Sequence, residues 1–185
     1  MPYILKVEYS LSSKKQLAEN LTIQRGFTKT IMRQYIGYIL GFIIFIVGIP
    51  MLMWFCSDRN VPDIWQWVVG GTFAVAGLAL AIWSIVHMKV HGQGNPFDAM
   101  GHEIAPRTQH LMTDGPYRYS RNPMLSGTFV YYIGIIAILC SWQAVLIFAV
   151  VVIIMMIQVR NEEQRLERDF GDDYRNYKHK VGRFL

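Results

Sequence analysis

The chain has 185 residues, of which 52% are hydrophobic and 17% are charged, and its formal net charge is +5. The apolar residues are gathered into long runs, as expected for one membrane-embedded domain with basic flanks. The charges form no basic stripe, since seven basic and six acidic residues alternate between 160 and 185. The sequence therefore predicts a lipid bilayer as partner and excludes nucleic acid.

In chain order, residues 1–34 form a polar, Lys-rich lead-in, so the first charge-free stretch begins too far in to be a cleaved signal peptide. Two charge-free stretches follow, and then 38 uncharged residues from Asn122 to Val159. As one helix this last stretch would measure about 57 Å, nearly twice a hydrocarbon core, so we expect it to fold back at Ser141. The sequence predicts an all-α integral membrane protein whose transmembrane helices lie at 35–56, 64–87, 123–140 and 142–159.

Lys and Arg are concentrated in the lead-in, in the 89–121 loop and in the tail after 159. By the positive-inside rule both termini are then cytoplasmic, and the protein is multi-pass with its polar motifs facing the cytoplasm. We divide the chain into the lead-in 1–34, a transmembrane pair 35–88 and a functional half 89–185. That half holds a loop, the helical hairpin 123–159 and helices within 160–181.

Small residues recur at helical spacing in the predicted spans. Gly70 precedes Ala74 by four positions, as Gly77 precedes Ala81, and Gly127 precedes Gly134 by seven. Such stripes favour close helix packing inside the bundle, with a homodimer face as the alternative. The two cysteines, Cys56 and Cys140, fall near the outer face, where unpaired packing thiols are favoured over a disulfide.

The 89–121 loop is rich in Gly and Pro and contains His91, His102 and His110. Their spacings of eleven and eight match no usual zinc pattern, so we predict no metal site. The loop ends in Gly115-Pro-Tyr-Arg-Tyr-Ser-Arg-Asn-Pro123. Pro123 suits the first turn of a helix whose free amides, with Arg118 and Arg121, would favour a carboxylate or phosphate.

Beyond the hairpin, Val159, Glu163, Leu166 and Phe170 fall on one helical face, so Glu163 interrupts an apolar stripe. Two interpretations remain open: a salt bridge to Arg118, Arg121 or Arg160, or a pocket carboxylate for a ligand's ammonium group. Gly171 is predicted to end this helix, and Asp172 to begin another whose Tyr174, Tyr177 and Val181 dock back. Anion donors beside an inward carboxylate suit an amino-acid zwitterion carrying an aromatic base, such as S-adenosylmethionine.

The Gly115-Pro-Tyr-Arg-Tyr-x-Arg-Asn-Pro-Met string, a hydrophobic hairpin and Glu162-Glu163-x-x-Leu166-x-x-x-Phe170-Gly171-x-x-Tyr174-x-x-Tyr177 together resemble the isoprenylcysteine carboxyl methyltransferase family. Related membrane methyltransferases that act on phospholipids are similar. The resemblance covers residues 100–183. It implies S-adenosylmethionine as cofactor, S-adenosylhomocysteine as product, and a lipophilic or lipidated methyl acceptor.

The resemblance also implies roles for single residues. Arg160, with Arg121, would position the acceptor, and either Glu162 or Glu163 would hold the cofactor's amino group. The remaining cofactor contacts would come from the following residues: His102, Gln109, His110, Leu111, Met112, Tyr117, Arg118, Asn122, Pro123, Met124 and Leu125.

Three positions depart from the family pattern: Asn122 replaces a common histidine, Leu125 a tyrosine, and Gln158 an arginine. These three departures affect the predicted identity of the methyl acceptor more than the predicted binding of the cofactor. We therefore predict methyl transfer to the carboxylate of an isoprenylcysteine-like or other lipid-like molecule, with a phospholipid or amine N-methyltransferase as the alternative. Two further alternatives, from other classes of protein, are an NADPH-dependent membrane reductase and a non-catalytic membrane scaffold.

Overall fold

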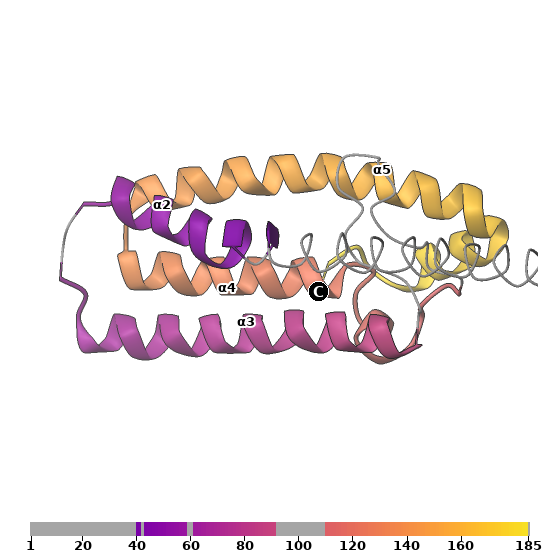
Figure 1. Ribbon diagram of the computed structural model, residues 1–185, viewed down its shortest axis with the longest axis horizontal. Coiled ribbons are helices and arrows are strands. Elements are labelled where there is room, and N and C mark those ends of the chain that lie inside the picture. The colour runs from indigo at the N-terminus through magenta and orange to yellow at the C-terminus, as the bar shows by residue number, and fades with distance from the viewer. Residues whose placement is uncertain (1–39, 42, 59–60, 92–109, 185) are drawn as a thin grey trace, which may run out of the picture.

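The computed structural model describes residues 40–41, 43–58, 61–91 and 110–184, and the regular elements in these ranges are all helical. The helices form an elongated bundle in which α4 lies between α3 and α5, with α2 against α4 and α5 (Figure 1). Their bounds are as follows: π-helix η1 Ile43–Gly48, α2 Ile49–Cys56, α3 Ile64–His91, 3-10 helix η2 Gly115–Arg118, α4 Pro123–Leu139 and α5 Trp142–Lys180.

Two of these helices, α3 and α5, are long and apolar enough to cross a membrane. Ile43–Cys56 and Pro123–Leu139 are also apolar but shorter. The all-helical class is therefore confirmed for the described residues, whereas four crossings and the cytoplasmic termini stay predictions. The first predicted span begins at residue 35, which lies outside the described residues. The whole lead-in 1–34 also lies outside them.

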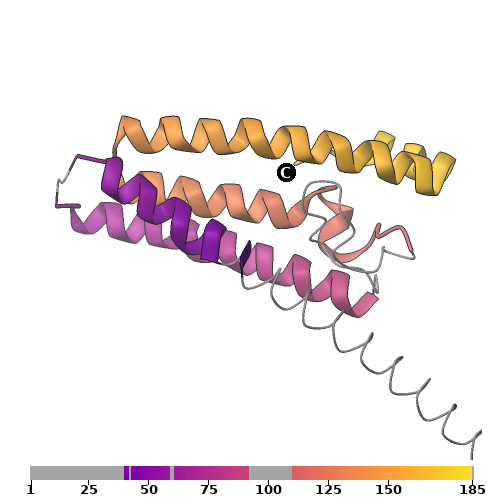
Figure 2. The ribbon, with the colours of Figure 1, turned by 45° about the horizontal axis from the view of Figure 1, so that its top comes forward.

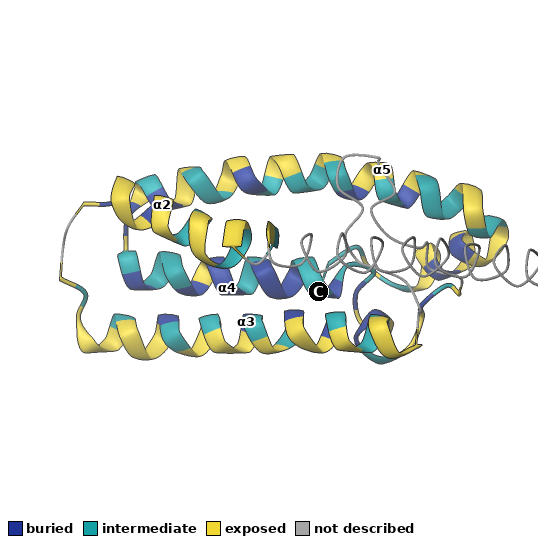
Figure 3. Cartoon of the chain, in the orientation of Figure 1, coloured by how far each residue is buried: buried dark blue, intermediate teal, exposed yellow. Residues whose placement is uncertain are grey.

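The outward faces of α3 and α5 carry much of the exposed apolar surface (Figure 3). On α3 the exposed side chains include Trp65 and Val75, whereas the buried positions are small: Gly70, Gly77, Ala81 and Ser84. An apolar outside and a small-residue inside are typical of a helix that contacts lipid on one side and another helix on the other.

Glycines on α3 and α4 face each other and bring the two backbones together. A Cβ at Gly70 would lie 2.5 Å from the carbonyl oxygen of Gly134, and one at Gly127 would lie 2.6 Å from the amide of Ala81. The stripes predicted to pack within the bundle do so, because the partner of each stripe lies on the other helix of the same chain. The alternative of a homodimer face stays a prediction.

The turn between α4 and α5 is confirmed at Ser141. Cys140 adopts a left-handed conformation, with φ of 46°, and its amide donates to the carbonyl of Ile136 at 2.7 Å. Ser141 is extended and Trp142 begins α5. Cys56 and Cys140 are both exposed free thiols at this end of the bundle.

The hydrophobic core lies where α2, α4 and α5 meet, around Met53, Tyr132, Ala144 and Val151. Two tyrosines of α4 also satisfy backbone groups of the π-helix: Tyr131 donates to the carbonyl of Ile46 at 2.9 Å, and Tyr132 to that of Phe45 at 2.8 Å. These two hydrogen bonds from side chains of α4 to carbonyls of η1 stabilise the π-helix.

Candidate functional site

The functional half is brought together because the chain reverses direction at Gly171. This glycine has φ 55° and ψ −124°, a backbone conformation that interrupts α5 and turns the last helical residues back toward the start of α4 (Figure 2). Tyr174 and Tyr177 are buried by this return, and the Tyr177 hydroxyl donates to the Tyr117 carbonyl at 2.6 Å. The predicted break and docking are therefore confirmed.

The loop segment before α4 is anchored to the end of α3. Gly115 has φ of 55°, and a Cβ there would lie 2.5 Å from the His87 ring, so the ring packs directly on the glycine. His87 Nε2 lies 3.1 Å from Asp114 Oδ1, and this hydrogen bond holds the pKa of the Asp114 carboxyl below its usual value. Sequence inspection missed both residues, because a pair 27 positions apart has no local pattern.

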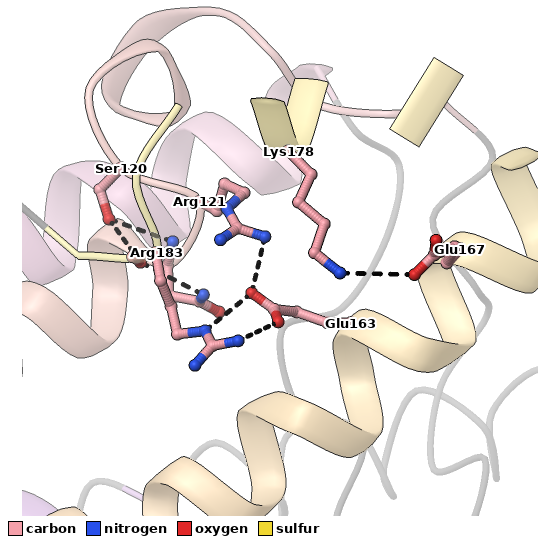
Figure 4. A network of polar contacts seen from close by, with 7 residues as sticks. Ser120, Arg121, Glu163, Glu167, Lys178 and Arg183 are labelled. Carbon is pink, nitrogen blue, oxygen red and sulfur yellow. Dashed lines mark hydrogen bonds and ion pairs between the residues drawn. The ribbon is translucent and has the colours of Figure 1, made fainter. Parts of the chain in front are cut away.

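Glu163 lies in the centre of a buried ion network (Figure 4). Only 5% of Glu163 is exposed, and Val159 one turn before it is also buried, as the helical face predicted. Arg121 Nη1 lies 2.8 Å from Glu163 Oε1. Arg183 donates to the same carboxylate through Nε at 3.0 Å and Nη2 at 2.6 Å. These hydrogen bonds raise the pKa of the Arg183 guanidinium.

The structure therefore supports the salt-bridge interpretation of Glu163: its partners are Arg121, one of the three arginines considered from the sequence, and Arg183, which was not predicted. The other two arginines considered from sequence, Arg118 and Arg160, are exposed. The two polar motifs on either side of the hairpin are in direct contact, which is the juxtaposition that the sequence predicted.

The C-terminal segment 181–184 lies against the residues that immediately precede α4, and these residues fix the position of Arg183. The Arg121 amide donates to the Gly182 carbonyl at 2.9 Å. Ser120 Oγ and Asn122 Nδ2 both donate to the Arg183 carbonyl, at 3.2 and 3.4 Å. The Phe184 ring lies 5.4 Å from that of Phe129.

The proposed cofactor contacts differ in exposure. Met112, Tyr117 and Pro123 are buried, Leu111, Asn122, Met124 and Leu125 are partly buried, and His110 and Arg118 are exposed. His102 and Gln109 lie outside the described residues.

Glu162 lies beside the ion network but on a different side of α5. It is partly buried, and its carboxylate lies 3.8 Å from Arg165. Burial, and to a smaller extent the charge of Glu162, raise the pKa of the Tyr117 phenol. Among the described residues no group of His, Cys, Asp and Glu is arranged to hold a metal ion.

Comparison with known proteins places the sequence of this chain in a family. A family model described as phospholipid methyltransferase matches residues 65–173, from α3 past the break at Gly171. Over 72 residues the chain is 36% identical to the protein-S-isoprenylcysteine O-methyltransferase of Schizosaccharomyces pombe, which covers 38% of this chain and 30% of that protein. Over 45 residues it is 47% identical to an uncharacterised protein of Haemophilus influenzae, covering 24% of this chain and 68% of that protein.

The chain thus spans less than a third of the length of the fission-yeast relative. No solved structure matches. The family match covers more than half of the chain and includes nearly all of α3, the whole of α4, both Arg121 and Glu163, and the first residues after the break. This chain is a membrane protein that belongs to the phospholipid methyltransferase family.

Proposed function

We propose that this protein is an S-adenosylmethionine-dependent methyltransferase that acts on a membrane-borne acceptor. The observation that carries the proposal is the contact of Arg121 with Glu163, which joins the motif before the hairpin to the motif after it. The family supports the reaction class, and the name of the fission-yeast relative supports an acceptor attached to a lipid. We further propose four crossings, with the site at the cytoplasmic boundary.

The residues present fit the chemical groups of the cofactor. An amino-acid zwitterion needs a carboxylate for its ammonium group, and Glu162, whose charge acts on the Tyr117 phenol, provides one. Glu163 is less suited to this role, because both arginines already use its oxygens. Tyr117 and Met112 are both buried. The Tyr117 ring is flat and the Met112 side chain is apolar, and side chains of these kinds pack on an aromatic base.

When bound, S-adenosylmethionine supplies an electrophilic methyl group on a sulfonium. The chain's contribution is to align the acceptor in line with that methyl and to exclude water. A carboxylate acceptor is already ionised and needs no base. An amine acceptor must first lose a proton, for which Glu162 and His110 are the candidates among the described residues.

The experiment is a comparison of ligands on the purified full-length chain in detergent. Calorimetric titration with S-adenosylhomocysteine should give saturable binding, whereas NADPH should give none. Glu162→Gln should weaken S-adenosylhomocysteine binding about tenfold, because the ammonium group loses its counter-charge. Arg118→Gln, at an exposed position, tests the predicted role of that arginine in the same titration. Binding of NADPH alone would refute the methyltransferase proposal in favour of a reductase.

A further inference from the structure

The turn that carries Tyr117 has little regular structure of its own. It is the four-residue 3-10 helix η2, in which the Tyr117 amide donates to the Asp114 carbonyl at 3.0 Å and the Tyr119 amide to the Pro116 carbonyl at 3.2 Å. The hydrogen bonds of a 3-10 helix have poorer geometry than those of an α-helix, which keeps such helices short. The position of the Tyr117 ring therefore depends on what the turn packs against.

His87, near the end of α3, packs on this turn with the face of its ring. A Cβ added at Gly115 would lie 2.5 Å from the ring's Cε1, 2.6 Å from Nε2 and 2.8 Å from Nδ1. Because these distances are nearly equal, the glycine lies over the ring face and not beside its edge. Gly115 also has φ of 55°, so the turn comes this close to His87 because no side chain stands at that position.

A nitrogen of the same ring makes the second contact. His87 Nε2 lies 3.1 Å from Asp114 Oδ1, and the His87 side chain is only 12% exposed. Asp114 occupies the position from which an aspartate usually caps the helix that follows, yet its side chain makes no capping hydrogen bond to η2. The carboxylate is directed to α3 instead. His87 thus contacts two consecutive residues at the start of the turn.

The other side of the turn is held by the returning part of α5. The Tyr177 hydroxyl donates to the Tyr117 carbonyl at 2.6 Å. The Tyr117 ring is buried, and its centroid lies 6.4 Å from that of the His87 ring. Since Tyr177 fixes the turn at Tyr117 itself, the contacts of His87 at the start of the turn decide how this residue is oriented.

We propose that His87 is a positioning residue for the cofactor, which holds Asp114 and Gly115 so that the Tyr117 ring is in place before S-adenosylmethionine binds. The identity of the ligand rests on the proposed function, whereas the contact of His87 with the turn does not. A contact that is already ordered raises affinity, because less ordering has to accompany binding. Loss of His87 should therefore weaken cofactor binding and leave the KM of the acceptor unchanged.

The first measurement is calorimetric titration of the purified full-length chain in detergent with S-adenosylhomocysteine. His87→Ala and Asp114→Ala should each weaken binding about tenfold, whereas His87→Gln, whose amide can still donate to Asp114, should stay within about threefold of wild type. The Asp114 side chain is 64% exposed, so its removal opens no core. His179→Ala, at an exposed histidine near the end of α5, is the matched control. Wild-type affinity in Asp114→Ala or in folded His87→Ala would overturn the proposal.

A double-mutant cycle with Tyr117→Leu tests whether His87 acts through Tyr117. If it does, the chain with both His87→Ala and Tyr117→Leu should bind S-adenosylhomocysteine about as weakly as Tyr117→Leu alone. A residue that only stabilises the fold would lower the unfolding midpoint and leave the affinity of the folded protein as it is. Losses of affinity that add in the double variant would contradict a positioning role.

Hydrogen exchange measured without ligand separates this proposal from the proposed function. The amides of Tyr117 and Tyr119 should exchange faster in His87→Ala and Asp114→Ala than in wild type, while amides in the middle of α4 should not change. Unchanged exchange in the turn would overturn the role of His87. If wild type binds no S-adenosylhomocysteine but the turn still exchanges faster in both variants, the methyltransferase proposal fails and the hold of His87 on the turn stands.

Discussion

Glu163 occupies a position at which a single carboxylate joins three segments of the chain. It lies just beyond the apolar part of α5, and its partners come from the residue before α4 and from the C-terminal segment. Taking one member out of a buried ionic group leaves the others without a counter-charge. The stability of the functional half should therefore depend strongly on this residue.

Glu163→Gln should lower the free energy of unfolding by about 3–5 kcal/mol, because the buried guanidinium of Arg121 and the partly exposed one of Arg183 lose the carboxylate that they share. The matched control is Glu167→Gln. Glu167 pairs with Arg175 at 3.4 Å and Lys178 at 3.5 Å at the surface, where such pairs contribute about 0–1 kcal/mol. The measurement is denaturant unfolding of both variants in detergent. A similar small loss in both would contradict a buried network.

The residue scale also shows why Arg183 was not predicted. Glu163 was recognisable, since a carboxylate on an apolar helical face is unusual. Arg183 lies 20 residues later, beyond the reversal at Gly171, in a segment without helical periodicity. Its pairing depends on where the returning chain ends, and no pattern of residues specifies that position.

At the scale of the elements, the contact between α3 and α4 rests on glycines. Gly77 faces the backbone of Gly127, and a Cβ added at Gly77 would lie 2.5 Å from the carbonyl oxygen of Gly127. Gly71, only six residues earlier on the same helix, has nothing within 4 Å of such a Cβ. The two positions therefore form a natural pair for comparison.

Gly77→Ala should destabilise the protein by about 1–3 kcal/mol, because backbone atoms cannot move aside as a side chain can. Gly71→Ala should be neutral or stabilising by about 0.5–1 kcal/mol, as expected for alanine in an open helical position. Unfolding midpoints of the two variants in the same detergent provide the comparison. Equal midpoints would mean that α3 and α4 are not packed as closely as described.

Much of the element arrangement could be predicted from sequence. The turn at Ser141 followed from an uncharged run too long for one crossing, and the break at Gly171 followed from a glycine after an amphipathic helix. The π-helix Ile43–Gly48 could not be predicted, since its carbonyls are satisfied by tyrosines about 85 residues away. The packing of the His87 ring on Gly115 could not be predicted either, because these two residues are also far apart in the sequence.

At the scale of the whole molecule, the two cysteines and the ion network mark opposite ends of the bundle. Cys56 ends α2 and Cys140 follows α4, whereas Arg121 precedes α4 (Figure 1). If the bundle crosses the membrane with its site in the cytoplasm, both thiols face the outside. The proposed orientation therefore has a direct chemical consequence.

A membrane-impermeant maleimide should label Cys56 and Cys140 in intact cells, since both thiols are exposed and free. A chain with both cysteines replaced by serine and with Asp173→Cys in the exposed tail should react only after permeabilisation. Mass spectrometry of the labelled protein reports each site. Labelling of Asp173→Cys in intact cells would reverse the proposed orientation.

The most direct measurement of the central claim is methyl transfer by the full-length chain reconstituted in lipid vesicles. With S-adenosylmethionine labelled in its methyl group, label should pass to the fraction extracted by organic solvent, and Glu162→Gln should reduce this transfer at least about tenfold. A wild-type chain that leaves the lipid-borne fraction unlabelled, when supplied with both carboxylate and phospholipid acceptors, would contradict the account.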